Sequence, residues 1–261
     1  MRVPNLVLAT DLDGTFLGGS EEQCRALYSH LRARDDVMLI FVTGRDIDFI
    51  AELIRVPGMP RPHYIIGDVG TSVYDGDKLA PVEDLEAPIR AKWKDANDRV
   101  VKMLEGEPGL RLQETSFRYR VSYDYDPAAL SPETIAKIEA AGFDCLLSAG
   151  RFLDVLPKGI SKGPTLVRVV EALRLDPESV LVAGDTMNDL SLFETGFKGV
   201  AVGNSEPRLA TAVGRMKNVY RSPLPGTAGI ADAIRHFRFE GDRSIEIEKI
   251  ITSHRLSSAA E

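Results

Sequence analysis

The chain has 261 residues, of which 44% are apolar, so it can bury a core large enough for one large domain or for a core with a smaller inserted one. Its formal net charge of −7 argues against a surface for nucleic acid or for an anionic membrane. The two cysteines, Cys24 and Cys145, favour thiols in a reducing cytoplasm over a disulfide framework. No leader segment or long apolar stretch is present in the sequence. We therefore expect a cytoplasmic protein that contacts neither nucleic acid nor membrane.

The first part of the chain alternates strand-like and helix-like segments. Continuous apolar strands separated by helices indicate a parallel sheet that is covered on both faces. In chain order we expect a strand at 6–10, a helix at 21–34, a strand at 38–42, a helix at 47–54 and a strand at 64–67.

The middle of the chain has a different pattern, which predicts an antiparallel α+β insert of about 70 residues over the core, a cap of ordinary domain size. It begins with a turn-rich segment, and Ser131 is the expected N-cap of its second helix. In chain order we expect turns at 74–88, a helix around 93–104, strands at 111–113 and 119–125, a helix at 132–141, and strands at 145–148 and 152–156.

The alternating pattern then resumes, and the two outer stretches together predict one α/β fold, a doubly wound parallel-sheet (Rossmann-like) core with the inserted cap. The expected elements are helices at 162–173, 190–195, 206–213 and 228–237, and strands at 180–183, 199–202 and 218–220. We expect core residues at 1–82 and 158–240, the cap at 83–157, and a charged C-terminal tail at 241–261 whose last residues fray.

Asp11 and Asp13 stand two residues apart where the first predicted strand ends, with Gly14 directly behind them. Paired carboxylates at the mouth of a buried strand repel each other, so the pair calls for a cation, and a divalent metal shared with a phosphate is the simplest candidate. One carboxylate can attack phosphorus while the other moves a proton. An ordinary strand-to-loop turn is the alternative.

Two further groups suit a bound phosphate. Thr43 and Gly44 follow the second predicted strand, where a hydroxyl and a flexible amide can hold a phosphate oxygen, although turn chemistry also explains them. Lys162 opens a predicted helix and would offset negative charge there. Lys158 competes for this role, and a lysine in a loop is usually solvated surface.

Asp185, Asn188 and Asp189 follow another apolar strand. Carboxylate and amide oxygens are the ligands that Mg²⁺ prefers, whereas a helix N-cap cluster is the alternative interpretation. Because ligands of open α/β sheets bind at the carboxyl ends of the strands, the four groups are expected to converge.

In this order the four motifs resemble those of the haloacid dehalogenase superfamily, in its branch of aspartate-based phosphatases. The resemblance implies that Asp11 is the nucleophile, which forms an aspartyl-phosphate, and that Asp13 is the general acid and base. It implies a Mg²⁺ ion held by Asp11, Asp185 and the main-chain carbonyl of Asp13, with Asp189 in support. The phosphate-binding residues implied are Thr43, Gly44, Lys162 and Asn188.

The insert between the second and third motifs is similar to the type II cap rather than to the cap of dehalogenases. The segments 67–71, 153–159 and 184–189 most resemble those of sucrose-phosphate and mannosylfructose-phosphate phosphatases. The resemblance implies hydrolysis of a sugar phosphate monoester, foremost a disaccharide phosphate such as sucrose 6-phosphate. Other phosphatases of the same cap type act on mannosylfructose phosphate, glucosylglycerol phosphate, mannosyl-phosphoglycerate or hexose phosphates, and these remain alternatives.

Two residues depart from that subgroup, Asp68 and Met187, and both are candidates to line the sugar pocket. In the cap, arginines could bond sugar hydroxyls and Tyr119 could stack on a ring, although exposed residues of an antiparallel strand explain the pattern equally well. The candidate substrate-binding residues are Arg45, Gly70, Thr71, Arg118, Arg120 and Lys158.

The alternative of a different class is a non-catalytic sugar-phosphate-binding module that docks on a glycosyltransferase synthase. All expected catalytic positions are filled, which favours an enzyme, while docking on a cognate synthase in addition to catalysis stays open. We expect a monomer or a weak dimer. The four histidines show no ligand spacing and are interpreted as core or surface residues: His30, His63, His236 and His254.

Overall fold

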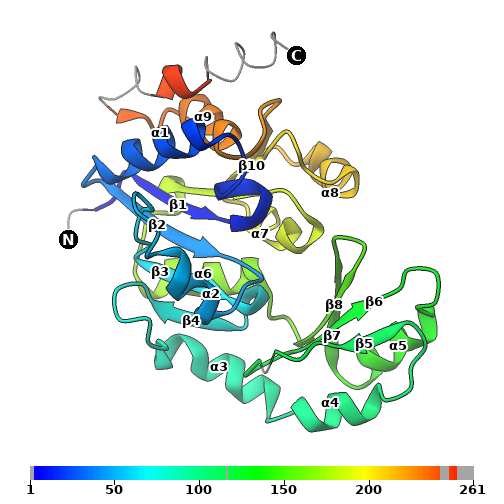
Figure 1. Cartoon of the computed structure of the whole chain (residues 1–261). Helices are drawn as coiled ribbons and strands as arrows, with labels where there is room; N and C mark the ends of the chain where they lie inside the picture. Colours follow the sequence, from blue (N-terminus) through cyan, green and yellow to red (C-terminus); the bar gives the residue numbers. More distant parts are fainter. Residues whose placement is uncertain (1–2, 116, 242–246, 252–261) are drawn as a thin grey trace.

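The computed structural model describes residues 3–115, 117–241 and 247–251. Two sheets organise these residues, a seven-stranded sheet with helices on both faces and a four-stranded sheet beside it (Figure 1). The first sheet is formed by both ends of the described chain, and the second by its middle part. This confirms the predicted α/β class, a doubly wound core with an additional α+β unit.

The large sheet has the order β11-β10-β9-β1-β2-β3-β4, in which every neighbouring pair is parallel except β3 with β4. The central strand β1 and its neighbours β2 and β9 are buried along their whole length, as continuous apolar strands between two helical layers should be. The strands are β1 Leu6–Thr10, β2 Val37–Val42, β3 Tyr64–Gly67, β4 Ser72–Asp75, β9 Val180–Gly184, β10 Lys198–Ala201 and β11 Val219–Arg221.

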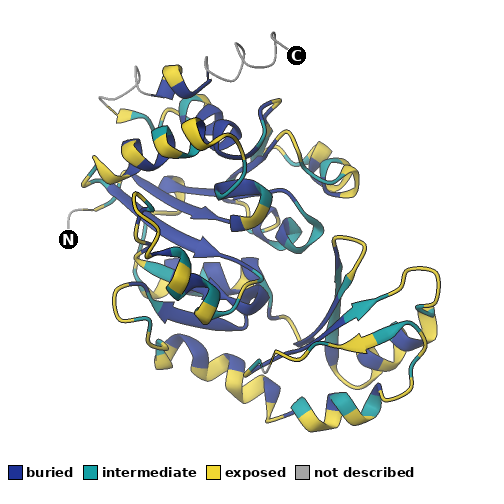
Figure 2. Ribbon diagram, in the orientation of Figure 1, coloured by how far each residue is buried: buried dark blue, intermediate teal, exposed yellow. Residues whose placement is uncertain are grey.

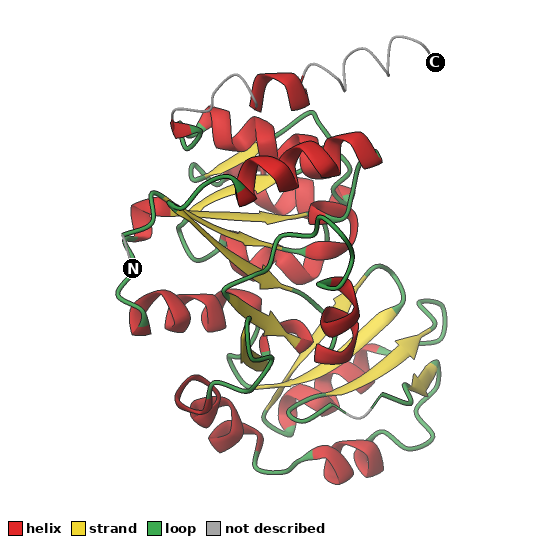
Figure 3. Cartoon of the chain, turned by 60° about the vertical axis from the view of Figure 1, so that its left-hand side comes forward, coloured by secondary structure: helices red, strands yellow, loops and turns green. Residues whose placement is uncertain are grey.

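Alternate residues of β1 enter two separate apolar clusters, one on each face of the sheet. Val7 packs in the cluster that holds Leu166 of α6, and Leu8 in the cluster that holds Leu27 of α1 and Ile230 of α9. Figure 3 shows the helices on either side of the sheet. The helices of this part are α1 Glu21–Arg32, α2 Ile47–Leu53, α6 Lys162–Ala172, α7 Leu190–Phe193, α8 Pro207–Ala212 and α9 Gly226–His236.

The middle part, residues 83–157, is called the cap below. Its sheet has the order β5-β6-β8-β7 with antiparallel neighbours throughout, and it packs on its helices through Trp93, Tyr123 and Val155. Ser131 caps α5 by accepting a hydrogen bond from the Thr134 amide, as predicted. The cap elements are α3 Glu83–Trp93, α4 Asn97–Met103, β5 Leu110–Leu112, β6 Val121–Tyr125, α5 Pro132–Ala140, β7 Phe143–Ser148 and β8 Phe152–Pro157.

The segment 74–104 departs from the prediction. It was expected as turns followed by one helix, whereas it contains the end of β4 and two helices, α3 and α4. The helices are separate because Lys94 and Asp95 both have positive φ, 53° and 50°, a backbone conformation that ends a helix. Pro88, which suggested a turn, lies inside α3.

Of the expected C-terminal tail, only residues 241 and 247–251 lie within the described chain, so the predicted fraying of the last residues lies outside it. Ile247, Ile250 and Ile251 are buried, in the apolar cluster of α1 and α9 (Figure 2). No helix among the described residues combines the length and the apolar character needed to cross a membrane.

Candidate active site

The polar motifs meet at the carboxyl edge of the large sheet. Asp11 follows β1, Thr43 follows β2, and Asp185 follows β9, so that three adjacent strands each present one chemical group at the same edge. Lys162 is the first residue of α6. The sheet topology therefore brings together residues that are up to 178 positions apart in the sequence, Asp11 and Asp189.

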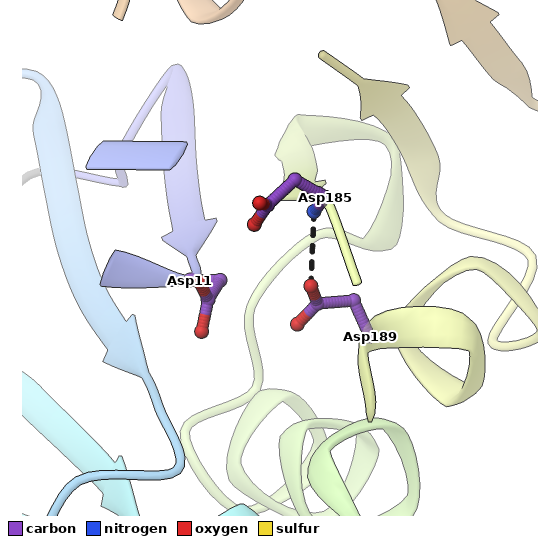
Figure 4. Close-up of side chains that lie close together, drawn as sticks. All are labelled: Asp11, Asp185 and Asp189. Atoms are coloured by element: carbon purple, nitrogen blue, oxygen red, sulfur yellow. Dashed lines mark hydrogen bonds between the residues drawn. The ribbon is translucent and has the colours of Figure 1, made fainter. Parts of the chain in front are cut away.

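Asp11, Asp185 and Asp189 form a buried cluster, in which one carboxylate oxygen of each lies within 4.8 Å of the others (Figure 4). Asp189 Oδ2 accepts a hydrogen bond from the Asp185 amide at 2.9 Å, which fixes the turn after β9. The Thr15 hydroxyl donates to Asp185 Oδ1 at 2.8 Å. Gly14 has φ +77°, and a Cβ there would lie 2.3 Å from Asp185 Oδ2, so only glycine allows this approach.

Lys162 is fully buried among these groups. Its Nζ donates to Asp11 Oδ1 at 2.6 Å, to Asp189 Oδ1 at 2.6 Å and to Asn188 Oδ1 at 2.8 Å. Gly70 sets the position of the helix that carries it, since a Cβ on Gly70 would lie 2.2 Å from the Ser161 carbonyl carbon. The competing Lys158 has an exposed side chain paired with Asp144 at 2.6 Å, and it takes no part in this cluster.

The cluster carries too much negative charge for one ammonium. Burial raises the pKa of Asp11 well above its usual range, against the opposing effect of Lys162, while burial and the neighbouring Asp189 raise the pKa of Asp185 to about 7. Burial lowers the pKa of Lys162, but Asp11 and Asp189 outweigh burial and raise it overall. Three carboxylates facing one ammonium leave an excess of two negative charges, and oxygen donors of this kind fit a divalent cation such as Mg²⁺.

Asp13 points to Arg45 rather than into the carboxylate cluster. Arg45 donates to both oxygens of Asp13, Nε to Oδ2 at 2.8 Å and Nη2 to Oδ1 at 3.0 Å, and both side chains are half exposed. The guanidinium lies over the Phe49 ring at 4.6 Å. Hydrogen bonding to Asp13 raises the pKa of Arg45. Arg45, expected as a substrate contact, is here the partner of the expected acid and base.

The loop after β2 holds Thr43 in a fixed orientation. The Thr43 side chain is buried, and its Oγ1 accepts a hydrogen bond from the Arg45 amide at 3.1 Å, so the hydroxyl hydrogen is directed away from that amide. A Cβ built on Gly44 would lie 4.0 Å from Asn188 Nδ2, which places this loop opposite the loop after β9.

A cavity of about 470 Å³ lies between this edge and the cap. Its core wall includes Asp11, Asp13, Gly44, Arg45 and Asn188, and its cap wall consists of Gln113, Thr115, Phe117, Arg120, Ser148, Ala149, Phe152 and Asp154. A hollow of about 490 Å³ between β11 and α9, lined by Tyr220 and His236 among others, contains none of the carboxylates described above.

The structure separates the expected substrate contacts into two groups. Arg45 and Arg120 line the cavity, although both already bind carboxylates. The other four lie outside its described lining because each has a role in packing or in another ion pair. Arg118 binds Glu86 and the Tyr74 hydroxyl, Lys158 binds Asp144, the Thr71 hydroxyl donates to the Asp68 carbonyl, and the Gly70 carbonyl accepts from Thr165.

Asp68 and Met187, the two residues that depart from the pattern of the phosphatases that the sequence resembles, also lie outside the described lining of the cavity. Asp68 is buried, accepts a hydrogen bond from Ser72 and lies 3.7 Å from the Arg120 guanidinium. Met187 packs in the core, and its amide donates to Glu206 at 3.1 Å. Tyr119 is buried, and the Arg118 guanidinium lies 5.1 Å from its ring.

The sequence reasoning missed several residues of the site. Thr15 directly follows the Asp-x-Asp-Gly motif, and a hydroxyl at that position was the signal that could have identified it. Glu206 contacts both the loop after β9 and the cap, and nothing in the sequence marks it. The three aromatic residues of the cavity wall are Phe49, Phe117 and Phe152.

The histidines and cysteines have other places in the structure. His63 Nδ1 accepts a hydrogen bond from the Leu39 amide, His236 stacks on Tyr220, and His30 is buried, whereas His254 lies outside the described residues. Cys24 and Cys145 are both free thiols and half-buried. These residues give no second set of metal ligands in the part of the chain that the structure describes.

Comparison with known proteins gives one family. The model of sucrose-6F-phosphate phosphohydrolases matches residues 4–238. The mannosylfructose-phosphate phosphatase of Agrobacterium fabrum is 31% identical over 244 residues, which cover 90% of this chain and 97% of that protein. The glucosylglycerol-phosphate synthase of Pseudomonas anguilliseptica is 41% identical over 244 residues, which cover 93% of this chain but 32% of the synthase. This chain therefore spans about a third of the length of that relative.

One solved structure is similar in both fold and sequence. It is the X-ray structure of the sucrose-phosphatase from a Synechocystis species in complex with sucrose and phosphate. The TM-score is 0.81 at 26% identity, and the match covers 90% of this chain and 98% of the other. The similarity therefore extends over both sheets rather than over the large sheet alone.

Proposed function

The chain belongs to the sucrose-6F-phosphate phosphohydrolase family, which is of the haloacid dehalogenase type, and we propose that it hydrolyses the phosphate ester of a small neutral sugar, foremost a disaccharide such as sucrose 6-phosphate. The membership confirms the resemblance drawn from the four motifs and the expectation of a phosphoric monoester hydrolase. The observation that carries the proposal is the buried Asp11–Lys162 pair on the floor of a cavity that the cap encloses.

In the proposed reaction the Asp11 carboxylate attacks phosphorus. A bond forms between the carboxylate oxygen and phosphorus while the bond from phosphorus to the sugar oxygen breaks. Asp13, which enters this step protonated, gives that oxygen its proton and leaves the step as a carboxylate. Water, deprotonated by Asp13, then releases phosphate from Asp11. Lys162, at 2.6 Å, orients Asp11 and reduces its repulsion from the phosphoryl oxygens.

A bound Mg²⁺ would be held by Asp11, Asp185 and the Asp13 main-chain carbonyl, with Asp189 in support. It would neutralise charge on the phosphoryl oxygens. The other residues act on the phosphate or on a proton. Thr43 and the amides of its loop, Gly44 included, bind phosphate oxygens opposite the Asn188 amide. Asp13 can reach the leaving oxygen only after its pair with Arg45 has opened, and the half-exposed position of both side chains permits this.

The charges of the cavity support a neutral leaving group. Arg45 and Arg120 are the basic residues in its described lining, and each already binds a carboxylate, Asp13 and Asp154. A second anionic group on the substrate, as in mannosyl-phosphoglycerate, would gain a cation only by competing with Asp13 for Arg45 or with Asp154 for the buried Arg120. The cap wall instead offers hydroxyl, amide and aromatic groups, which suit a polyhydroxyl ligand: Gln113, Thr115, Phe117, Ser148 and Phe152.

Glucosylglycerol phosphate is the second candidate substrate. The observation that favours it is the 41% identity to a glucosylglycerol-phosphate synthase, of which about a third is similar to this chain. Under this proposal a glycosyltransferase synthase makes the phosphorylated glycoside that the present chain hydrolyses. Docking of the chain on such a synthase would shorten the path of the intermediate.

The test is phosphate release from a panel of esters in the presence of Mg²⁺ or a chelator. The panel contains sucrose 6-phosphate, mannosylfructose phosphate, glucosylglycerol phosphate, mannosyl-phosphoglycerate and hexose phosphates. We expect one neutral glycoside phosphate to be preferred by at least about tenfold in kcat/KM, and chelation to abolish turnover.

Asp11→Asn removes the nucleophile at nearly constant shape, and exposed Asp98→Asn in α4 is the matched control. We expect the first variant to be inactive and the second to be unchanged. Full activity of Asp11→Asn would contradict the mechanism, and equal rates across the panel would contradict the substrate class. Sugar-phosphate binding without turnover in the unmodified protein would instead support the non-catalytic binding module.

A further inference from the structure

Among the described residues, two hydrogen bonds join the cap to the loops around the phosphate site, one from the side chain of Arg120 and one to the side chain of Glu206. Arg120 also lies 3.7 Å from Asp68 of the core. We infer that Arg120 and Glu206 are positioning residues, which register the closed cap on the two loops that hold the phosphate site. The inference rests on the proposed function, because it assigns both residues to the same hydrolysis. The two contacts are called the closure contacts below.

The first closure contact is a buried arginine that bridges the two sheets. Arg120 Nη1 donates to Asp154 Oδ1 of the cap at 2.8 Å, and Nη2 donates to the Gly44 carbonyl of the core at 2.8 Å. Arg120 is 4% exposed, and its guanidinium lies 3.6 Å from the centre of the Phe117 ring. Both Nη atoms already serve these partners and burial makes an unpaired charge costly, so we assign Arg120 to joining the two sheets; its buried Nε has no hydrogen-bond partner among the described residues.

This contact acts on Thr43 through one peptide group. The Gly44 carbonyl that accepts from Arg120 and the Arg45 amide belong to the same planar peptide. That amide donates to Thr43 Oγ1 at 3.1 Å. By holding the plane of the peptide, Arg120 therefore also orients the Thr43 hydroxyl, and small errors in such positioning reduce rates strongly.

The second closure contact lies at Glu206, in the loop between β10 and α8. Glu206 Oε1 accepts from the Ala149 amide of the cap at 3.2 Å, and Oε2 accepts from the Met187 amide at 3.1 Å. The Glu206 amide itself donates to the Asp185 carbonyl at 2.8 Å. One residue thus joins the cap to both ends of the loop that begins with Asp185.

The cap residue of this contact lies at the tip of the β7–β8 hairpin, which extends toward the core (Figure 1). Ala149 and Gly150 have φ of +52° and +59°, the values of a tight hairpin turn, and the Arg151 amide closes the turn on the Ser148 carbonyl at 3.1 Å. The hairpin is therefore short and well defined, and it can transmit the position of the cap sheet to Glu206.

The first closure contact ends on the loop after β2. The second ends on Glu206 in the loop after β10, which is hydrogen-bonded to the loop after β9, and β2 and β9 are the two strands that flank β1. A closed cap therefore fixes the Thr43 loop and the Asp185 loop together on either side of Asp11, and an open cap releases both. Substrate that holds the cap closed completes the site. Loss of either contact should lower kcat more than it raises KM, because the reacting groups lose their alignment while the other polar and aromatic residues of the cap wall remain to bind the sugar.

The test is a double-mutant cycle with Arg120→Met, Glu206→Gln and the double variant, assayed on the glycoside phosphate that the unmodified protein prefers. We expect each single variant to lose about 10- to 100-fold in kcat, and the double variant to lose much less than the product, since both contacts hold one closed state. Arg120→Lys keeps the charge but cannot bridge both partners, so its kcat should fall between that of the unmodified protein and that of Arg120→Met. Arg111→Met, which breaks an exposed pair with Asp124 in the same cap sheet, is the control and should be unchanged. Multiplicative losses would overturn the inference.

Hydrogen exchange supplies a readout that does not depend on turnover. In Arg120→Met we expect faster exchange of the amides of 148–151, and in Glu206→Gln faster exchange of those of 43–45, because each variant loosens the contact at the other side. Unchanged exchange at the remote contact would contradict the coupling. An unmodified protein that hydrolyses no sugar phosphate, but shows these exchange changes in the variants, would refute the proposed function and still support the closure contacts.

Discussion

Lys162 and Arg120 are two buried cations that are held in different ways. Arg120 lies in the cap wall of the cavity, whereas Lys162 lies outside the described lining and binds Asp11 and Asn188 of the core wall. The carbonyl and carboxylate partners of Lys162, namely Asp11, Asn188 and Asp189, all belong to the core. Arg120 instead joins Asp154 of the cap to the Gly44 carbonyl of the core.

The difference separates two requirements of the site. The phosphate end is built within one sheet, where neighbouring strands keep the groups in place whatever the cap does. The part of the cavity that would receive the leaving group is formed by the core and the cap together, so its geometry exists only while the two are in contact. In the proposed mechanism, the groups that react with phosphorus therefore belong to the core. Their alignment on a bound substrate depends on the contact between core and cap.

Removal of the core cation should have the largest effect. Lys162→Met leaves Asp11, Asp185 and Asp189 buried without their ammonium, so we expect a loss of about 10³-fold or more in kcat and of about 3 kcal/mol in the free energy of unfolding. Lys158→Met is the matched control, because that exposed side chain pairs with Asp144 only at the surface. Phosphate release and urea unfolding measure the two losses. Equal effects of the two substitutions would mean that the core cluster is not the catalytic one.

Most of this core cluster can be predicted from the sequence, because residues that directly follow continuous apolar strands are expected at the carboxyl edge of a parallel sheet. Asp11, Thr43 and Asp185 each come directly after such a strand, and parallel strands place these ends side by side. The choice of Lys162 over Lys158 rested on the start of a helix at Lys162, which the structure confirms, and on the resemblance, in which the lysine lies 23 residues before Asp185. Thr15 was missed because its partner Asp185 is 170 residues away.

The cap contacts could not be predicted in the same way. Arg118 and Arg120 are two residues apart in a strand-like segment, so the pattern puts both on the same face and does not tell which of them meets the core. The partner of Arg118 is Glu86, which lies on α3, in a segment that the turn residues and Pro88 made look irregular. Contacts between two separately folded units depend on how the units dock, and no local periodicity encodes that.

The pair of arginines gives the next prediction, of intermediate size. Arg118 donates to Glu86 at 2.9 Å, and Glu86 is fully buried and also accepts from the Val73 amide. Arg118→Met leaves a buried carboxylate without its cation, so we expect a loss of about 2–3 kcal/mol in the free energy of unfolding. We expect kcat to change by less than about threefold, because Arg118 lies outside the described lining of the cavity.

Arg120→Met is the matched variant for Arg118→Met, two residues away. It leaves Asp154 and Asp68 buried without their cation, so it should lose a similar free energy of unfolding, but its loss in kcat should be much larger. Urea unfolding and steady-state rates on the same four samples, the two single variants, their double variant and the unmodified protein, give both quantities. A loss of kcat in Arg118→Met as large as that in Arg120→Met would remove the distinction between an arginine that holds the cap together and one that positions the site.

The smallest effect is expected for an ion pair that belongs to neither cluster. Hydrogen bonds from Arg34, and then from Asn5, lower the pKa of Asp36 to about 2. A carboxyl whose pKa is lower in the folded chain than its unfolded value of about 3.9 stabilises the fold fully above that value, and the stabilisation disappears as the pH falls through the folded pKa. The free energy difference between the unmodified protein and Asp36→Asn should therefore be about 1 kcal/mol or less at pH 7 and should shrink between about pH 4 and pH 2. Urea unfolding at pH 7 and pH 3.5, with and without added salt, measures this difference. Salt should reduce it, since the Asp36 side chain is 24% exposed although Arg34 is buried, whereas the carboxylate partners of Lys162 and Arg120 are buried too. A difference that grows as the pH falls would show that Asp36 is not held as the charged partner of Arg34.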